Sequence, residues 1–261
     1  MDAASATLTT KMVDTCSITD IIEVYDSPAT SLVPAVYMTA FSFVPAPATV
    51  VYVDGFNLYY GALKGTPHRW LDLDGLFRRL RPGDDIQQIR YCSAMVVGPT
   101  RPNQEVYLKA LATTPKVEVS LGKFKEKQVR CGVSACTFSG SRFYTTQEEK
   151  RTDVNIAVAM IDDANRGVCE KVILVSGDSD LVPAVTLVRS RHPSIEITVY
   201  VPANHRRRAF ATELRGAAHK HRDLPLRLLP LSQFPDPITL RDGSLLSKPA
   251  DWAVLTGTTP S

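Results

Sequence analysis

The sequence predicts an α/β fold in which a mostly parallel, doubly wound sheet carries helices on both faces. First, short β-branched and aromatic runs alternate with stretches whose apolar residues recur at helical spacing, as in strand–helix–strand units. Second, the chain of 261 residues is 44% hydrophobic, which is enough to bury a large core. Third, prolines interrupt the apolar stretch 32–53, so no segment is suited to cross a membrane.

The first half of the predicted fold begins with a buried strand at residues 50–53 that ends at an Asp-Gly turn. A helix follows at residues 73–80, where Leu73, Leu76 and Phe77 share one face. The next elements are a strand, a helix, a strand and the returning arm of a hairpin, at residues 89–97, 103–113, 116–127 and 139–146.

The second half continues the alternation. A helix is expected from Thr152, the expected N-cap, to Gly167. The segment 170–193 predicts a strand, an acidic turn and a helix. The remaining elements are a strand, a basic helix and a last short strand, at residues 194–202, 206–220 and 224–230.

Composition divides the chain into three segments. Residues 1–46 hold Lys11 as their single basic residue against five acidic ones, and we expect them to be a disordered extension or the product of a start assigned too far upstream. Residues 47–232 form the predicted folded domain, and residues 233–261 a tail that packs on the domain or frays. The net charge of +3 is too small to indicate a nucleic-acid partner by itself.

The cysteines predict a reducing, cytoplasmic environment. Their number, five, is odd, and the chain shows no secretory signal. Cys131 and Cys136 are close in sequence, which admits zinc, but their spacing is loose and no second Cys/His pair follows. Ordinary thiols are therefore the favoured interpretation of this pair.

Four aspartates follow strands or begin a helix. Asp54 ends the first strand, Asp153 lies in a helix first turn, and Asp178 and Asp180 follow a later strand, where Gly177 is expected to permit a tight turn. Taken singly, each is better explained as a turn, cap or helix-dipole residue. The carboxyl ends of parallel strands share one edge, however, so we expect these side chains to meet.

A cluster of four carboxylates needs a compensating cation. Two like charges 4 Å apart repel by roughly 4 kcal/mol at an effective dielectric constant near 20. Oxygen ligands on an open site suit Mg²⁺ or Mn²⁺, which can activate water and stabilise charge on a phosphodiester. Neither a P-loop motif nor G-x-G-x-x-G follows the first strand, and Phe56 stands where a haloacid-dehalogenase-like phosphatase carries its second Asp.

Three ordered motifs, "VYVDGFNLYYG", "EEKRTDVNIAVAMIDDA" and "ILVSGDSDLVPAV", resemble the NYN domain of the PIN-like nuclease superfamily, and its bacterial LabA-like members in particular. The resemblance implies a PIN-like sheet and a ribonuclease that uses Mg²⁺ or Mn²⁺. It assigns Asp54, Asp153, Asp178 and Asp180 as metal ligands, and Asn57 as a residue that orients Asp54 or touches substrate. Glu149 precedes Asp153 as in relatives, without a clear role.

Two basic segments are candidates for binding RNA. Arg206, Arg207 and Arg208 follow a strand end, and Lys125 belongs to a lysine group on the hairpin. For either segment alone, a solvated surface is an equally good explanation. Tyr59 and Tyr60 follow "DGFN" and can stack on bases, although core packing is the better explanation for one of them.

Two alternatives to the ribonuclease stay open. One is a catalytically silent RNA-binding or regulatory module. The other is a Toprim-like site on DNA, which needs a Glu at the position that Asp54 occupies. The sequence leaves open whether the chain forms a homo-oligomer.

Overall fold

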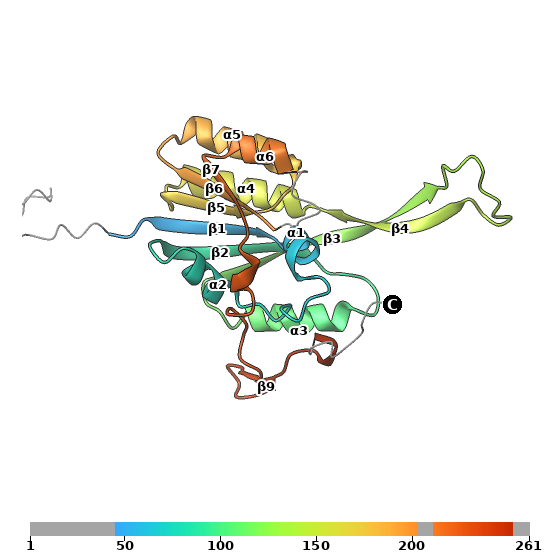
Figure 1. Ribbon diagram of the computed structural model, residues 1–261, viewed down its shortest axis with the longest axis horizontal. Coiled ribbons are helices and arrows are strands. Elements are labelled where there is room, and N and C mark those ends of the chain that lie inside the picture. The colour runs from blue at the N-terminus through green and yellow to red at the C-terminus, as the bar shows by residue number, and fades with distance from the viewer. Residues whose placement is uncertain (1–44, 203–210, 253–261) are drawn as a thin grey trace, which may run out of the picture. The chain divides into compact units, whose positions relative to one another are not determined.

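The computed structural model describes residues 45–202 and 211–252. Its centre is a seven-stranded sheet in the order β4-β3-β2-β1-β5-β6-β7 (Figure 1). All neighbouring strands run parallel except β3 and β4, which are antiparallel. The strands are β1 (Ala48–Asp54), β2 (Asp85–Ala94), β3 (Val117–Arg130), β4 (Phe143–Lys150), β5 (Lys171–Val175), β6 (Glu196–Val201) and β7 (Lys220–Asp223). The predicted α/β, mostly parallel fold is confirmed.

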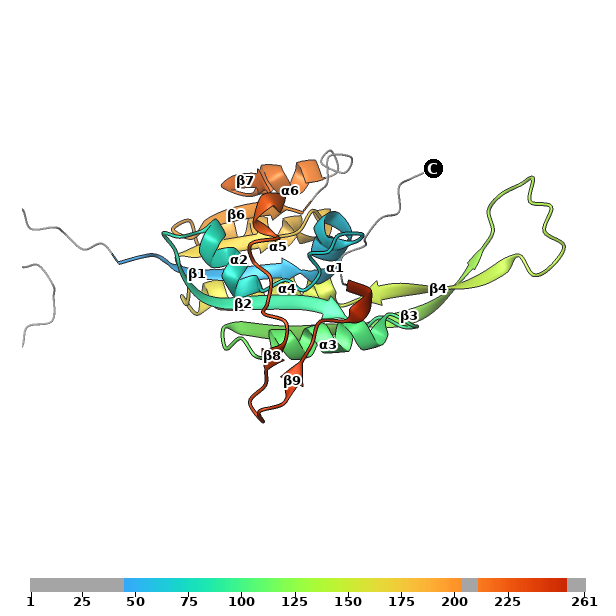
Figure 2. The same ribbon diagram turned by 60° about the horizontal axis from the view of Figure 1, so that its bottom comes forward.

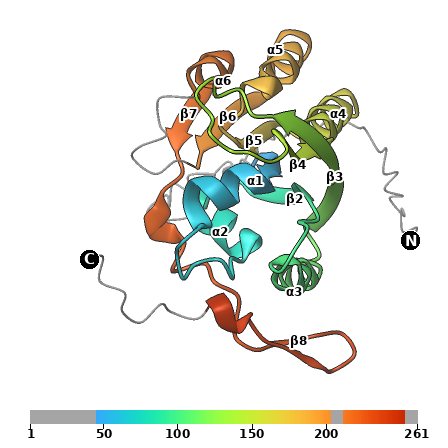
Figure 3. The ribbon, with the colours of Figure 1, turned by 90° about the vertical axis from the view of Figure 1, so that its right-hand side faces the viewer.

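Helices cover both faces of the sheet (Figure 3). Helices α1, α2 and α3 lie on one side and α4, α5 and α6 on the other. The helices are α1 (Gly55–Leu58), α2 (Leu73–Leu80), α3 (Arg101–Leu111), α4 (Thr152–Asn165), α5 (Val182–Arg191) and α6 (Thr212–Ala217). A π-helical turn, η1 (Tyr59–Leu63), continues α1, and a 3₁₀ turn, η2 (Ser179–Leu181), precedes α5.

The alternation of side chains along β1 divides the interior into two cores. Val51 and Val53 face the core that also holds Trp70, whereas Val50 and Tyr52 face the core under α4 and α5. Because both faces of the central strands are buried, their sequences are continuous apolar runs instead of alternating ones.

Strands β3 and β4 continue past the sheet as a two-stranded ribbon (Figures 1 and 2). β2 pairs with β3 only as far as Gly122, and from Lys123 to Arg130 β3 pairs with β4 alone. The side chains of Phe143 and Tyr144 on this ribbon are 57% and 55% exposed.

Some predicted elements differ from the structure. The last strand of the seven-stranded sheet is β7, and the predicted strand 224–230 is wrong. Leu226–Leu228 forms a 3₁₀ turn after Pro225, which has no N–H to donate to a strand. The described part of the basic helix is α6, and it ends before Lys220, which belongs to β7. Thr152 is the first residue of α4 and Arg151 its N-cap, so the predicted cap is displaced by one residue.

The described part of the C-terminal tail packs on the domain. β8 (Ile238–Thr239) and β9 (Leu245–Leu246) pair antiparallel (Figure 2). The ring of Trp252 lies 6.4 Å from that of Trp70, centroid to centroid. Within the described ranges, no helix has both the length and the apolar composition needed to cross a membrane. The predicted N-terminal extension lies almost entirely outside these ranges, and the predicted boundaries stay predictions.

Candidate functional site

Asp54 is a buried carboxylate at the carboxyl end of β1. It caps α1, and its side chain is held by three hydrogen bonds while the residue is only 2% exposed. The backbone N–H of Asn57 donates to Oδ1 at 3.0 Å, and Asn57 Nδ2 donates to Oδ2 at 2.6 Å. Ser176 Oγ donates to the same Oδ2 at 3.0 Å. The carboxylate is therefore fixed in one orientation by groups from two neighbouring strand ends.

Asn57 connects this carboxylate to the turn after β5. Its Oδ1 accepts a hydrogen bond from the backbone N–H of Gly177 at 3.1 Å. The backbone of Gly177 is not left-handed, since its φ lies outside that region. A Cβ at Gly177 would instead stand 3.4 Å from Asn57 Oδ1, so the glycine allows close approach of the amide.

The acidic turn continues the same chain of hydrogen bonds. Ser176 Oγ accepts from the N–H of Asp178 at 3.1 Å, and Asp178 Oδ1 accepts from the N–H of Asp180 at 3.0 Å. Asp178 is thus the cap of η2, which was the local explanation for its presence. Capping occupies one carboxylate oxygen, so it does not exclude a second role for this residue.

Asp153 joins the group from the first turn of α4. The preceding Arg151 has a left-handed backbone with φ of 85°, which costs about 1–2 kcal/mol in a residue with a side chain. This conformation turns the chain from β4 into α4. Glu149 Oε1 accepts from the N–H of Thr152 at 3.1 Å and also from its hydroxyl, and so lies beside the start of the helix.

The electrostatics show that these carboxylates share one region. Burial raises the pKa of Asp54, and the charge of Asp178 raises it further. Burial also raises the pKa of Asp153, to about 6, and the charges of Asp54, Asp178, Glu149 and Asp180 add to the shift. Among the described residues, no Lys, Arg or His forms an ion pair with any of the four aspartates.

The carboxylates do not converge closely enough for three of them to bind one ion. Within residues 45–202 and 211–252, no three His, Cys, Asp or Glu side chains are close enough to enclose a metal ion. The donor set nevertheless suits Mg²⁺ or Mn²⁺, which keep several waters and need only one or two protein carboxylates each. Cys131 and Cys136 are free and partly exposed.

The predicted basic residues are less informative. Lys125 is exposed on the ribbon, and because successive strand residues point to opposite faces, it lies on the face opposite Phe124. Its assignment to RNA binding stays a prediction. Arg206, Arg207 and Arg208 lie outside the described residues.

Some residues around the site were not predicted from the sequence to belong to it. Glu149 was left without a role, although its charge acts on Asp153. The aromatic rings of Phe56 and Phe124 contact each other beside the capped aspartate, at a centroid distance of 5.6 Å. The position of Phe56 inside "DGFN" was the only available signal, because Phe124 joins the site through the path of the ribbon.

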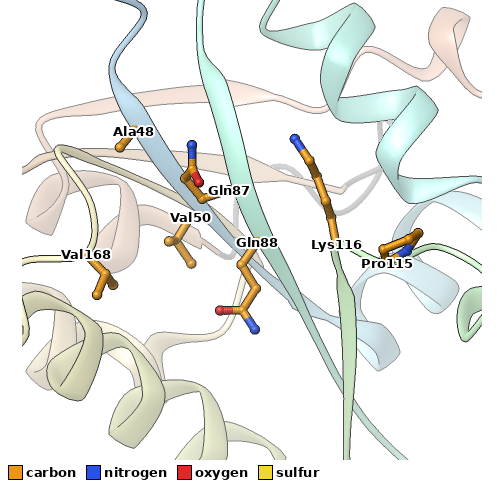
Figure 4. Close-up of a pocket in the computed structure, with 7 residues that line it drawn as sticks. All are labelled: Ala48, Val50, Gln87, Gln88, Pro115, Lys116 and Val168. Carbon is orange, nitrogen blue, oxygen red and sulfur yellow. The ribbon is translucent and has the colours of Figure 1, made fainter.

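A pocket of about 370 Å³ lies at the opposite end of the strands (Figure 4). It is lined by Ala48 and Val50 of β1, Gln87 and Gln88 of β2, and Lys116 before β3, with Pro115 and Val168. Asp54 ends the strand that Ala48 begins. This pocket contains none of the aspartates and does not belong to the acidic site.

Fold and site together define an α/β domain with a group of aspartates, of which Asp54 is buried, at the carboxyl edge of the parallel strands. The sequence model of the NYN domain matches residues 48–225, and the chain belongs to this family, which is part of the PIN-like superfamily. The match spans every element that carries the aspartates.

Two individual proteins are similar to the chain. The 6-hydroxy-3-succinoylpyridine 3-monooxygenase HspA of Pseudomonas putida is 28% identical over 236 residues, which cover 78% of this chain and 75% of the relative. A crystal structure of a protein of unknown function from Vibrio parahaemolyticus matches with a TM-score of 0.44 and 20% identity, over 69% of this chain and 94% of that one.

Proposed function

We propose that this NYN domain hydrolyses RNA phosphodiester bonds with the help of Mg²⁺ or Mn²⁺. The observation that carries the proposal is the acidic site, where the pKa of Asp153 is raised to about 6 by burial and by neighbouring carboxylates, and where no basic side chain among the described residues pairs with the aspartates. Mutual repulsion of this kind is unfavourable for the fold, and a divalent cation would relieve it. The family is nuclease-like, which agrees with this chemistry.

The residues of the site have two roles in this proposal, which are to bind the ion and to position the carboxylate of Asp54. Asp54, Asp153 and Asp178 are the candidate ligands, of which one or two would hold each ion, with Asp180 at the outer side of the turn, where it is exposed. A bound divalent ion would supply a water of lowered pKa and stabilise charge on the phosphate. Asn57 and Ser176 keep the Asp54 carboxylate in place, since both donate hydrogen bonds to its Oδ2. Asn57 is therefore a positioning residue.

Cleavage of a labelled RNA with and without Mn²⁺ tests the proposal. Asp54→Asn and Asp178→Asn are expected to lower the rate by about a thousandfold or more, because each removes a charge that holds the ion. Asp162→Asn is the matched control, since Asp162 lies on α4 and its side chain is 60% exposed. Equal cleavage by the wild type and the double variant would contradict the mechanism.

The alternative of a silent RNA-binding module predicts a different outcome. In that case the wild type would bind Mn²⁺ and RNA, as measured by calorimetry, but would leave the RNA intact. The retention of an aspartate at every metal-ligand position favours the enzyme.

A second candidate function comes from the relative that covers 78% of the chain, a monooxygenase by name. It predicts oxygen consumption with 6-hydroxy-3-succinoylpyridine and a reductant. Oxygen uptake that requires this substrate, together with absence of RNA cleavage, would favour oxygenation over hydrolysis. We further propose a reducing compartment such as the cytoplasm, since the four cysteines of the described part are all free.

A further inference from the structure

Three aromatic side chains form a cluster next to the acidic site, since Phe56 is two residues from Asp54 and Phe124 pairs with Glu149 across the ribbon. Phe56 and Tyr60 lie one helical turn apart, with their rings nearly parallel at 17° and their centroids 6.3 Å apart. Phe124 of the ribbon meets Phe56 edge-on at 5.6 Å. We call Phe56, Tyr60 and Phe124 the aromatic cluster.

The aromatic cluster does not serve to fill the interior. Among the described residues, the two hydrophobic cores and the side chains packed against them include Tyr59 but none of the cluster. Tyr60 is 46% exposed, and Phe56 and Phe124 are partly exposed. Aromatic rings that contact one another outside any core, close to a group of carboxylates, are suited to receive a ligand.

Charge beside the cluster indicates what kind of ring it would receive. The ammonium group of Lys64 lies 4.8 Å from the centroid of the Tyr60 ring. An exposed cation next to an aromatic surface matches a ligand that joins a flat ring to an anion, as a nucleotide joins a base to a phosphate. The neighbouring aspartates repel phosphate unless a divalent cation is bound, so the base would contact the rings while its phosphate lies toward Lys64.

We propose that the aromatic cluster binds an unpaired base of single-stranded RNA beside the cleaved bond, and thereby sets the preference for single strands. This inference rests on the proposed function. The faces of a base are covered by its neighbours in a duplex, so only a single strand can offer a base to stack on Tyr60 and Phe56. Stacking also tolerates any base, so the cluster selects strandedness and not sequence.

The geometry of η1 supports a fixed position for the cluster. A Cβ at Gly61 would lie 1.5 Å from the carbonyl oxygen of Pro202, so the π-helical turn that carries Tyr60 presses directly against the end of β6. Tyr59 anchors the same turn by packing against the first core. Tyr60 is thus held outward by a rigid support, which favours a preorganised binding surface.

The test compares two ligands of equal charge with Ca²⁺ in place of Mn²⁺, so that a divalent cation neutralises the aspartates, and the labelled ligands are checked to be intact after each titration. They are a fluorescein-labelled single-stranded decauridylate and an abasic ribose-phosphate chain of the same length, with anisotropy as the readout. Tyr60→Ala should weaken binding of the decauridylate about tenfold, because a stacked base contributes roughly that much. The same variant should leave binding of the abasic chain, and of a duplex of equal length, unchanged.

Two control variants separate stacking from damage to the fold. Tyr60→Phe retains the ring and should bind the decauridylate as the wild type does. Tyr144→Ala removes an aromatic ring that is 55% exposed on the opposite face of the ribbon from Phe124, and should also have no effect. Circular dichroism checks that each variant is folded.

The inference is overturned if Tyr60→Ala weakens both chains equally, or neither, or if the wild type binds the two chains with the same affinity. These outcomes differ from a failure of the proposed function. Cleavage that depends on Asp54 but not on Tyr60 would leave the nuclease proposal intact and remove this one. Base-dependent binding through Tyr60 in a protein that never cleaves RNA would do the reverse.

Discussion

Asp163 and Asp54 are both buried aspartates close to the same sheet, but among the described residues only Asp163 has a positively charged partner. Asp163 on α4 is 1% exposed and receives Arg90 in a two-pronged ion pair, with Nε 2.7 Å from Oδ2 and Nη2 2.9 Å from Oδ1. The hydroxyl of Tyr52 adds a hydrogen bond of 2.6 Å to Oδ2. Asp54, which is 2% exposed, receives only neutral donors and faces other carboxylates.

The difference shows in the titration of the surrounding groups. The hydrogen bonds that Arg90 donates to Asp163 are the main reason that the pKa of Arg90 is raised, so the pair stabilises its charged state. At the acidic site, by contrast, the pKa values of Asp54 and Asp153 are raised, so the charged state is the unfavourable one. The first region completes its charge balance within the fold, whereas the described residues around the second supply no positive charge to its aspartates.

The largest expected effect is a loss of stability when the carboxylate of Asp163, which Arg90 pairs with, is removed. Asp163→Ala would leave Arg90 and the hydroxyl of Tyr52 without their buried partner, and should lower the free energy of unfolding by about 3–5 kcal/mol. Urea unfolding followed by circular dichroism measures this change. A loss of less than 1 kcal/mol would show that the two regions do not differ in their structural role.

The next largest effect is stabilisation of the acidic site by Mn²⁺. Mn²⁺ at a hundred times its dissociation constant should stabilise the wild type by about 2.7 kcal/mol, which raises Tm by several degrees. Asp54→Asn should abolish this rise, and the control Asp162→Asn should retain it. Thermal unfolding with and without Mn²⁺ makes the comparison, and an equal rise in Asp54→Asn would place the ion elsewhere.

A smaller effect is expected from Tyr52→Phe. This change removes one hydrogen bond to Asp163 but leaves the ion pair with Arg90, so it should cost about 1.5 kcal/mol. Burial, followed by the hydrogen bond to Asp163, raises the pKa of the Tyr52 hydroxyl, which stays protonated as a donor. The cost, measured by urea unfolding, should not change between pH 6 and pH 8, and a loss equal to that of Asp163→Ala would contradict it.

The smallest expected effect is a gain in stability, on substitution of Asp153. The pKa of Asp153 is about 6 in the folded protein and near 3.9 unfolded, so the folded state binds more protons between these values and loses stability as pH rises from about 4 to about 6. Asp153→Asn should therefore stabilise the metal-free protein at pH 7. The expected gain is roughly 1 kcal/mol, because partial exposure screens the charge.

Unfolding of this variant at two pH values gives the check. The gain should vanish at pH 4, where Asp153 is protonated in the folded wild type. A gain that is independent of pH would mean that repulsion between carboxylates is not its source.

The sequence was sufficient for the fold and for the positions of the aspartates along it, because both depend on local patterns. Apolar runs such as 50–53 specify buried strands, and Asp54 and Asp178 follow strand ends by their place in the chain. The Asp163–Arg90 pair joins residues 73 positions apart, and no local pattern announces it. The contact between Phe124 and Phe56 could not be predicted for the same reason, since only the path of the ribbon brings the two rings together.

The most direct test of the central claim is the position of Mn²⁺ in crystals of the wild-type protein, located by its anomalous scattering. We predict density at the acidic site, within coordination distance of Asp54, Asp153 or Asp178, and none beside Asp163. Saturating Mn²⁺ with no density at this site, and carboxylates that remain more than about 8 Å apart, would contradict the account, because ligands of one or two ions must converge.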